Sequence, residues 1–393
     1  MQIGIIGCGV AGQTAAIALT RQGHDVTIVE RFPEARPVGA GLLLQPSGLT
    51  VLERLGLRAE AESWGAPIHR LEGNTVRGRR VLALDYGREH GLGIHRGALF
   101  NLLHNAVRSS GARLTLGFDT VSIDDPDDPV LVARDGRREG PFDVVLDCAG
   151  AHDTTRDHLG IAVSAPVYPW GAFWCAVPDR DGRWTEALRQ TYDGAHTMMG
   201  ILPVGRAPES DARFVAFFWS LPLAQADAQK AAGLDVLKQR ILRAWPAARP
   251  VVDEITSFDQ FSLATYRDVV MRPWRRGRVL VIGDAAHGTS PQLGQGANLA
   301  LIDALTIAHC LNGKADIDNA LRRYEQMRRQ HLAYYQLTSR LLTPMFQSNS
   351  QVMAWLRDNL LVAARYVPIG GYVTRTTLAG VRKLPWGIWR PPD

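Results

Sequence analysis

A glycine-rich turn opens the chain, and an acidic residue follows it. The turn has the sequence Gly7-Cys8-Gly9-Val10-Ala11-Gly12, which fits the pattern G-x-G-x-x-G, and Glu30 lies downstream. Glycines there permit a tight turn, a close approach of the backbone to a pyrophosphate, and close packing of a helix on a strand. Free N–H groups at the start of the helix stabilise the phosphates, and the carboxylate accepts hydrogen bonds from ribose hydroxyls. These residues predict a site for an ADP moiety, without deciding between FAD and NAD.

The residues around this turn have the pattern of a strand, a helix and a second strand. Residues 3–6 are a short apolar run, residues 11–22 place apolar side chains at helical spacing before Gly23, and residues 25–29 predict a strand. This order is the unit from which parallel sheets are built. We therefore expect the turn at the edge of a parallel sheet.

Two later apolar runs end in similar junctions. Residues 144–146 lead into Ala149-Gly150, and residues 279–282 lead into Gly283-Asp284. Because the carboxyl ends of parallel strands meet at one edge of a sheet, we expect both junctions beside the glycine turn.

Between these two junctions the sequence changes to alternating strands rich in aromatic residues, which predicts one antiparallel sheet. Helical spacing returns after it and again in the last part of the chain. The expected strands are residues 170–177, 197–202 and 213–220, and the expected helices are residues 227–245, 322–340 and 352–367.

Composition and charge exclude several classes of protein. The 393 residues are 46% hydrophobic and 21% charged, which is typical of a globular chain long enough for two domains. The net charge of +5 comes mostly from scattered arginines, so it favours an anionic cofactor or substrate over nucleic acid. The four cysteines have neither metal-ligand nor disulfide spacing, and we expect a reduced, cytoplasmic protein without a metal. No signal peptide and no transmembrane segment are expected.

A longer motif lies around the third junction. It consists of Gly283-Asp284-Ala285-Ala286-His287, Pro291, the run from Gly294 to Asn298, and Asp303-Ala304. This pattern resembles the GD motif of the group A flavoprotein monooxygenases, the FAD-dependent aromatic-hydroxylase family with the para-hydroxybenzoate hydroxylase fold. The resemblance also covers Arg31, residues 39–41, residues 95–99 and the layout of the chain up to about residue 310.

The resemblance implies FAD as the cofactor and a role for each part of the motif. Asp284 would bind the ribityl hydroxyls, and Pro291 would lie near the reactive edge of the flavin. Backbone N–H groups of residues 294–298 would face the pyrimidine end of the isoalloxazine, where negative charge appears on reduction. Arg96 would contact the cofactor, and Val121 would present its backbone to the adenine. In full, the predicted FAD-binding residues are Gly7, Gly9, Val10, Ala11, Gly12, Glu30, Arg31, Gly41, Arg96, Val121, Gly283, Asp284, Pro291, Gly294, Gln295, Gly296, Ala297 and Asn298.

The resemblance also implies the fold class, which is α/β, with a Rossmann-like FAD-binding domain, an inserted antiparallel-sheet substrate domain and C-terminal helices. We expect the tail, which carries Trp355, Trp386 and Trp389, to pack over the FAD-binding domain or against the partner in a homodimer. Contact with a membrane surface is the alternative. The expected boundaries are residues 1–70, 96–165 and 270–310 for the FAD-binding domain, 71–95 and 166–269 for the substrate domain, and 311–393 for the helical region.

One segment departs from the family pattern. Residues 143–156 align without gaps to the segment that carries an Asp-Gly pair in the family, but Ala149 stands at the Asp position and Asp153 at the usual serine. Arg156 is retained. In the family this segment serves both the flavin and NAD(P)H. Asp147 either replaces the missing carboxylate or only caps the strand. The resemblance implies NADH or NADPH as the reductant, and an external reductant is the alternative.

The chemistry implied by the family needs a dry pocket beside the flavin. Reduced flavin and O2 give a C4a-hydroperoxide, which oxidises an aromatic or electron-rich small molecule productively only where water is excluded. Strand alternation puts Phe217 and Trp219 on one face of the sheet and Phe218 on the other. Tyr192 and His196 could raise the electron density of a phenolic ring. The predicted substrate pocket therefore comprises Tyr192, His196, Phe217 and Trp219, and no catalytic base is predicted.

Each of these interpretations has an alternative. The two sheet aromatics could be ordinary core, and Tyr192 and His196 could be solvated loop residues. A flavin oxidase or reductase of the same fold, without oxygen insertion, is the alternative function. A flavin halogenase is disfavoured because no lysine precedes Lys230.

Overall fold

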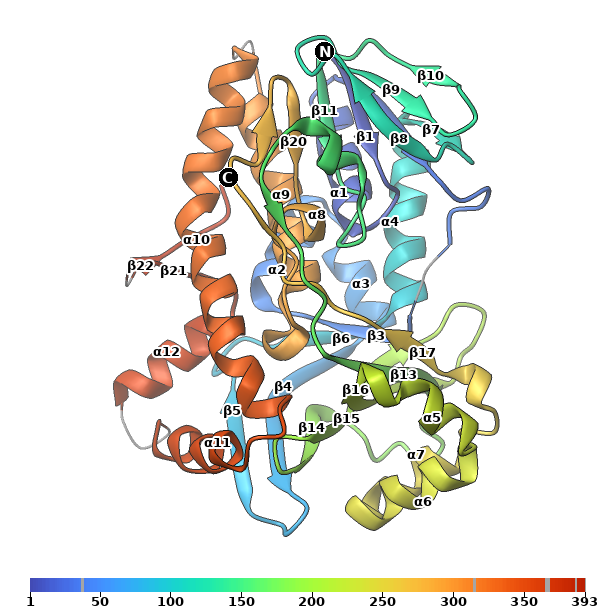
Figure 1. Cartoon of the computed structure of the whole chain (residues 1–393), viewed down its shortest axis with the longest axis vertical. Coiled ribbons are helices and arrows are strands. Elements are labelled where there is room, and N and C mark those ends of the chain that lie inside the picture. Colours follow the sequence, from blue (N-terminus) through green and yellow to red (C-terminus); the bar gives the residue numbers. More distant parts are fainter. Residues whose placement is uncertain (37–38, 314–315, 365–367, 386, 393) are drawn as a thin grey trace.

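Two large sheets organise the chain, one toward each end of the molecule (Figure 1). The computed structural model describes residues 1–36, 39–313, 316–364, 368–385 and 387–392. The first sheet has the strand order β19-β20-β11-β1-β2-β7 and is parallel except for β19. Its strands are β1 (Gln2–Ile6), β2 (Asp25–Glu30), β7 (Arg113–Leu116), β11 (Val144–Asp147), β19 (Arg275–Arg276) and β20 (Val279–Val281).

Helices and a small sheet surround this parallel sheet. Helix α1 packs between α4 and α9, and α2 also packs on α9, so apolar side chains of the sheet and helices form one large core. The bounds are α1 (Val10–Arg21), α2 (Pro46–Arg54), α3 (Arg58–Trp64), α4 (Arg96–Ser110), α8 (Asp284–His287) and α9 (Gly296–Leu311), with a small sheet of β8 (Thr120–Asp124), β9 (Val130–Ala133) and β10 (Arg138–Glu139).

The second sheet has the order β17-β13-β16-β15-β14-β4-β6-β3, and β5 pairs with β4. One face, here called the outer face, packs on α5, α6 and α7. The opposite or inner face packs on the ends of α10 and α12. The bounds are β3 (Gly41–Leu44), β4 (Ala66–Thr75), β5 (Arg80–Asp85), β6 (Gly91–His95), β13 (Trp170–Pro178), β14 (Glu186–Asp193), β15 (Thr197–Arg206), β16 (Arg213–Pro222), β17 (Ser262–Ala264), α5 (Ala226–Ala231), α6 (Leu234–Ala244) and α7 (Arg249–Asp253).

The last part of the chain connects the two ends of the molecule. The long helix α10 packs on α9 beside the first sheet and reaches the second sheet with its C-terminal end (Figure 1). Among the described residues, no helix combines the length and the apolar character needed to cross a membrane. The remaining elements are α10 (Ile317–Phe346), α11 (Gln351–Ala364), α12 (Pro368–Leu378), β12 (Val163–Ser164), β18 (Val270–Met271), β21 (Arg382–Lys383) and β22 (Gly387–Ile388).

The fold class predicted from the sequence is confirmed, with differences in detail. The helix expected over residues 227–245 is two helices, because Gly233 adopts a φ of +89° between them. The second sheet begins earlier than the predicted boundary at residue 71, because it takes in β3 and the start of β4. The division into domains remains a prediction. Residues 365–367 of the last expected helix, and Trp386, lie outside the described residues.

Candidate active site

A cavity of about 390 Å³ lies at the carboxyl ends of β1, β2 and β11. This is where parallel α/β sheets bind ligands, since helix N-termini and loops converge there. The start of α4 and the starts of α8 and α9 form its other walls. The lining residues include Gly7, Gly9, Val10, Ala11, Glu30, Arg31, Arg96, Thr120, Cys148, His152, Asp153, Asp284, Gly296 and Ala297.

The three glycines of the turn meet three different requirements. Gly7 has a φ of +96°, which a residue with a side chain rarely adopts. A Cβ on Gly12 would lie 2.0 Å from the carbonyl oxygen of Gly7, so glycine is needed for α1 to pack against the turn. A Cβ on Gly9 would meet nothing within 4 Å. Gly9 is the N-cap of α1, and no side chain caps that helix. The open space at Gly9 and the uncapped N–H groups fit a phosphate.

Glu30 fixes the other side of the turn. Its Oε2 accepts a hydrogen bond from the backbone N–H of Cys8 at 2.8 Å, and its Oε1 accepts one from Phe32 N–H at 3.1 Å. The carboxylate therefore stands at the cavity wall with lone pairs left for ribose hydroxyls. Burial, together with the charge of Glu30, raises the pKa of the Cys8 thiol to about 12, so this thiol stays neutral.

The starts of α8 and α9, on either side of the loop between these helices, form another wall of the cavity. Gly294 adopts a φ of +59° in this loop, and Gln295 and Gly296 follow it into α9. Asn298 holds the loop against β3, since its Oδ1 accepts a hydrogen bond from Gln45 N–H at 2.8 Å and its Nδ2 donates to Leu43 O at 3.2 Å. The N-terminus of α9 is thereby aimed into the same cavity that the glycine turn bounds.

The cavity brings together residues that lie far apart in the sequence. Of the predicted FAD-binding residues, Gly7, Gly9, Val10, Ala11, Glu30, Arg31, Arg96, Asp284, Gly296 and Ala297 line it. The others, Gly12, Gly41, Val121, Gly283, Pro291, Gly294, Gln295 and Asn298, lie outside the lining set, in the same loops or next to lining residues.

Comparison with known sequences identifies the protein family to which the chain belongs. A family described as "FAD binding domain" matches residues 1–335 of the chain. The chain belongs to the aromatic-hydroxylase family of FAD-dependent monooxygenases. Among its relatives, kynurenine 3-monooxygenase of Salinispora arenicola is 31% identical over 83% of this chain and 76% of that protein. The 2-heptyl-3-hydroxy-4(1H)-quinolone synthase of Mycobacteroides abscessus is 28% identical over 85% of this chain and 88% of that protein.

The fold agrees with that of solved monooxygenases. The tetrameric form of 2-methyl-3-hydroxypyridine-5-carboxylic acid oxygenase superposes with a TM-score of 0.80 at 22% sequence identity. The alignment covers 100% of this chain and 99% of that one. The two-sheet architecture, with the long helix α10 beside it, is therefore the fold of that oxygenase.

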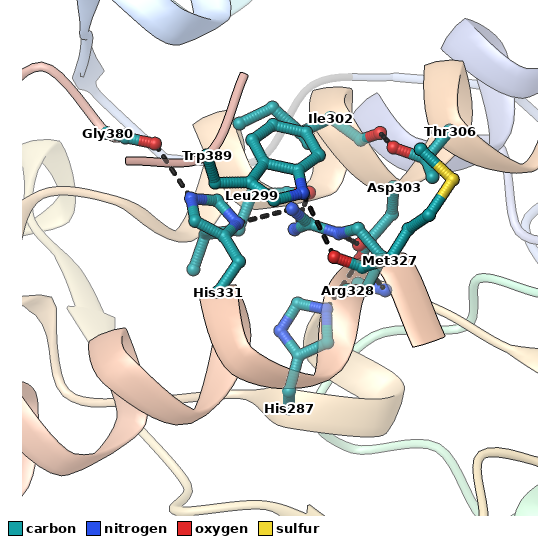
Figure 2. A network of polar contacts seen from close by, with 11 residues as sticks. His287, Leu299, Ile302, Asp303, Thr306, Met327, Arg328, His331, Gly380 and Trp389 are labelled. Carbon is teal, nitrogen blue, oxygen red and sulfur yellow. Dashed lines mark hydrogen bonds and ion pairs between the residues drawn. The ribbon is translucent and has the colours of Figure 1, made fainter. Parts of the chain in front are cut away.

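A buried polar network centred on Asp303 of α9 lies behind the loop of residues 288–295 between α8 and α9, here called the flavin loop (Figure 2). Its Oδ2 accepts a hydrogen bond from Gly283 N–H at 2.9 Å and contacts Nε2 of His287. Its Oδ1 accepts a hydrogen bond from Nε of Arg328 at 2.7 Å. Although burial opposes it, the charges of His287 and Arg328 hold the pKa of Asp303 far below its usual value. Asp303 therefore fixes the backbone directly before Asp284 as a buried carboxylate.

The same network continues to the C-terminal hairpin. Burial and the neighbouring Arg328 lower the pKa of His331 well below its usual value, so its ring is neutral. Its Nε2 donates to Gly380 O at 2.8 Å, and its Nδ1 accepts from Arg328 (Figure 2). Trp389 stacks on His331 with ring centroids 4.4 Å apart and donates to Met327 O at 2.9 Å. The C-terminal hairpin thus packs over the FAD-binding part of this monooxygenase, whereas α11 and α12 pack on β5 of the second sheet and Trp355 is exposed.

Asp147 ends β11 beneath the segment that departs from the family pattern. It is fully buried, its Oδ1 accepts a hydrogen bond from Ala149 N–H at 3.1 Å, and its Oδ2 has no partner among the described residues. Burial and the nearby carboxyl of Asp153 raise its pKa well above the usual value. Asp153 lines the cavity and caps the turn that begins at Thr155, whose N–H it accepts at 2.8 Å. The carboxyl group that faces the cavity in this segment is therefore that of Asp153.

Replacing Asp147 by asparagine is expected to stabilise the chain at pH 7, because burial and the nearby carboxyl of Asp153 make the charged form of this side chain unfavourable in the folded state. The raised pKa means that the contribution of Asp147 is fully present below about pH 4 and is lost as the pH rises through the folded-state value. Urea unfolding at pH 7 and at pH 4 should therefore show a gain that shrinks in acid. An Asp147→Asn variant less stable than the parent at pH 7 would contradict this, and the exposed Asp119→Asn serves as the control.

Cationic side chains surround the opening of the cavity. Arg31, Arg36 and His152 line it, and Arg267 donates from Nε to His152 Nδ1 at 3.3 Å. Burial, followed by the charges of Arg267, Arg31 and Arg156, lowers the pKa of His152. Sequence reasoning missed His152 as a lining residue, although it lies in the segment after β11 that was expected at the site. A positive rim of this kind suits phosphate groups.

The structure places Phe217 and Trp219 away from the flavin site. Both lie on the outer face of the second sheet, packed with Ile241 of α6 and Val252 of α7. Phe218 lies on the inner face instead. Both faces of this sheet are covered, so alternation could separate the two sets but could not show which set faces the flavin. This placement does not fit the pocket role predicted for Phe217 and Trp219.

Tyr192 and His196 also differ from expectation. Tyr192 lies within β14 and is fully buried on the inner face, so its interpretation as a solvated loop residue was wrong. Its hydroxyl donates to Oε1 of Gln190 at 2.8 Å, and the Arg357 guanidinium lies over its ring. His196 is exposed in the turn between β14 and β15, where its Nδ1 is hydrogen-bonded to Thr197 Oγ1. The two residues are therefore not neighbours in one pocket wall.

Proposed function

We propose that this FAD-dependent monooxygenase transfers one oxygen atom from O2 to a small aromatic or similarly electron-rich molecule, with NADH or NADPH as the reductant. The observation that carries the proposal is the single cavity that joins Gly9 at the start of α1 to Asp284 and the start of α9. FAD, in which the ribityl chain separates the pyrophosphate from the flavin ring, matches both walls.

The residues of the chain fit FAD in distinct ways. The uncapped N–H groups of α1 would bind the pyrophosphate, Glu30 the ribose hydroxyls, and Asp284 the ribityl chain. Bound FAD would supply two-electron reduction and the activation of oxygen. The N-terminus of α9 would stabilise negative charge on the ring, and the network of Asp303 would hold that loop in place.

The nicotinamide reductant is supported by the positive rim of the cavity. Arg31, Arg36 and Arg267 would attract the phosphates of a dinucleotide that approaches from solvent. Asp153 supplies a carboxyl group near the position where the family carries the Asp of its Asp-Gly pair. Direct reduction therefore does not require the residue that Ala149 replaces.

The proposal predicts a yellow protein whose oxidation of NADH or NADPH rises when an aromatic substrate is added. Reaction under 18O2 should yield a product that carries one labelled oxygen, detected by mass spectrometry. An oxidised product without the label would favour the flavin oxidase alternative. A colourless protein that takes up no added FAD would refute the proposal, and turnover only with chemically reduced flavin would refute the nicotinamide part.

We also propose that the chain self-associates as a homodimer. The solved oxygenase of the same fold is described as tetrameric, which supports contacts between copies in this architecture. Light scattering of the purified protein should give the mass of two chains, and the mass of one chain would refute this part.

A further inference from the structure

The inner face of the second sheet adjoins the flavin loop near Gln45. Tyr86 donates from its hydroxyl to Oε1 of Gln45 at 2.6 Å, and a Cβ on Gly294 would lie 3.6 Å from Nε2 of Gln45. Farther along the face, Trp174 donates from Nε1 to the hydroxyl of Tyr266 at 3.0 Å. The inner face is thus the part of the second sheet from which a substrate would reach the flavin.

Side chains on this face are apolar but incompletely packed. Trp174, Leu188 and Phe214 point from the strands, and Leu342 and Met345 from the end of α10. All five are only half-buried, although helices cover the face. Their remaining exposure indicates an apolar surface that a ligand can still contact.

On four neighbouring strands of the sheet, β13, β14, β15 and β16, the positions of this face carry no charge. They are the even-numbered positions of residues 170–176 in β13, 188–192 in β14, 198–204 in β15 and 214–220 in β16. Among these described positions there is no Asp, Glu, Lys, Arg or His. Polar contact is available only from neutral groups, such as the buried Nε2 of Gln45, which has no partner among the described residues.

Three arginines around this face are paired with carboxylates. Arg340 makes two hydrogen bonds to Asp268, at 2.6 and 2.9 Å. It follows Ser339, whose hydroxyl is hydrogen-bonded to that of Ser290 in the flavin loop. The other two pairs near the face are Arg357–Asp358 at 2.7 Å and Arg375–Asp85 at 3.0 Å. A substrate carboxylate buried here would lose its hydration without gaining any of these three paired cations, which is costly.

We propose that the substrate is a neutral, lipophilic aromatic compound that carries a hydrogen-bonding oxygen atom attached to its ring. It is not an aromatic carboxylic acid. The inference rests on the proposed function and narrows it, because it names the class of molecule that the inner face accepts. Relatives are named for both kinds of compound, so family membership does not make this choice. The choice between a neutral and a carboxylate substrate rests on the charge pattern of the inner face.

A matched pair of probes tests the inference. 2-Heptyl-4(1H)-quinolone and 4-oxoquinoline-2-carboxylate share a ring and differ in the alkyl or carboxylate substituent. Titrated into the holoenzyme, the alkyl compound should shift the flavin absorbance spectrum with a Kd at least tenfold lower than that of the carboxylate. Equal or tighter binding of the carboxylate, or no spectral change with either probe, would overturn the inference. Binding of the alkyl probe without transfer of labelled oxygen would refute the proposed function alone.

Two variants test the role of charge directly. Asp268→Asn releases Arg340 beside the flavin loop and should tighten carboxylate binding at least fivefold without changing the Kd of the alkyl probe. The control is Asp318→Asn, which releases arginines at the other end of α10. Leu188→Arg places a cation on the inner face itself and should have the same effect, with Val236→Arg on the exposed side of α6 as its control. If both test variants retain FAD and neither tightens carboxylate binding, the inference is wrong.

Discussion

Replacing Asp303 by alanine is expected to lower the free energy of unfolding by about 3–5 kcal/mol, because the change leaves a buried guanidinium without its carboxylate. Arg328 and Asp303 are both fully buried, and their ion pair is 2.7 Å long. The same carboxylate holds Gly283 and His287, so the loop before Asp284 should loosen as well. Urea unfolding of the apoprotein measures the first effect, and loss of FAD content measures the second.

A surface carboxylate near the start of α10, the helix that carries Arg328, gives the control. Asp318 pairs with Arg275 and Arg322 but is half-exposed, so Asp318→Ala should cost less than about 1 kcal/mol. If Asp303→Ala costs no more than this control, the buried network does not stabilise the fold.

The dependence of stability on pH follows from the same network. Asp303 has a lowered pKa, so its contribution is fully present above about pH 4 and is lost as the pH falls toward the folded-state value. His331 also has a lowered pKa, so the folded chain should begin to lose stability as the pH falls below about 6.5, where the unfolded histidine takes up a proton. In Asp303→Ala the loss below about pH 4 should be smaller than in the parent.

The first sheet could be predicted closely because its signals are local. The apolar runs at residues 3–6, 144–146 and 279–282 became β1, β11 and β20, and the glycine turn precedes α1 as expected. The second sheet was predicted only in its aromatic strands. Strands β3, β4 and β6 pair with partners far along the chain, and β4 joins β14 in a parallel pair. Nothing in their own sequence specifies those partners.

The candidate site also has a part that the sequence predicted and a part that it did not. Gly9, Glu30 and Asp284 were found because motif spacing places them at strand ends, and all three line one cavity. The aromatic residues predicted for the substrate pocket were placed less well, because alternation separates Phe217 from Phe218 without showing which of them packs against α6. Packing of α6 on one face and α10 on the other makes that distinction, and this packing is a property of the tertiary structure.

Replacing Gly9 by alanine is expected to raise the Kd for FAD about 100-fold, equivalent to about 2.7 kcal/mol, while the fold is retained. Gly9 has a φ of −82°, which alanine adopts readily, and a Cβ there would project into space that no described atom occupies within 4 Å. That space is where a phosphate would approach the N-terminus of α1, so a methyl group would exclude it. Titration of the apoprotein with FAD, followed by flavin fluorescence, measures the Kd.

Gly12, the next glycine of the turn, is expected to affect stability instead of FAD binding. A Cβ on Gly12 would lie 2.0 Å from the Gly7 carbonyl oxygen, so Gly12→Ala must displace α1 from the turn and should lower the free energy of unfolding by about 1–3 kcal/mol. Gly9→Ala should change it by no more than about 1 kcal/mol, the range found for N-cap substitutions. FAD binding at the parent's affinity in Gly9→Ala would mean that no phosphate approaches this glycine. A loss of stability equal to that of Gly12→Ala would mean that Gly9 serves the fold, and only weak binding in a stable protein assigns it to the cofactor.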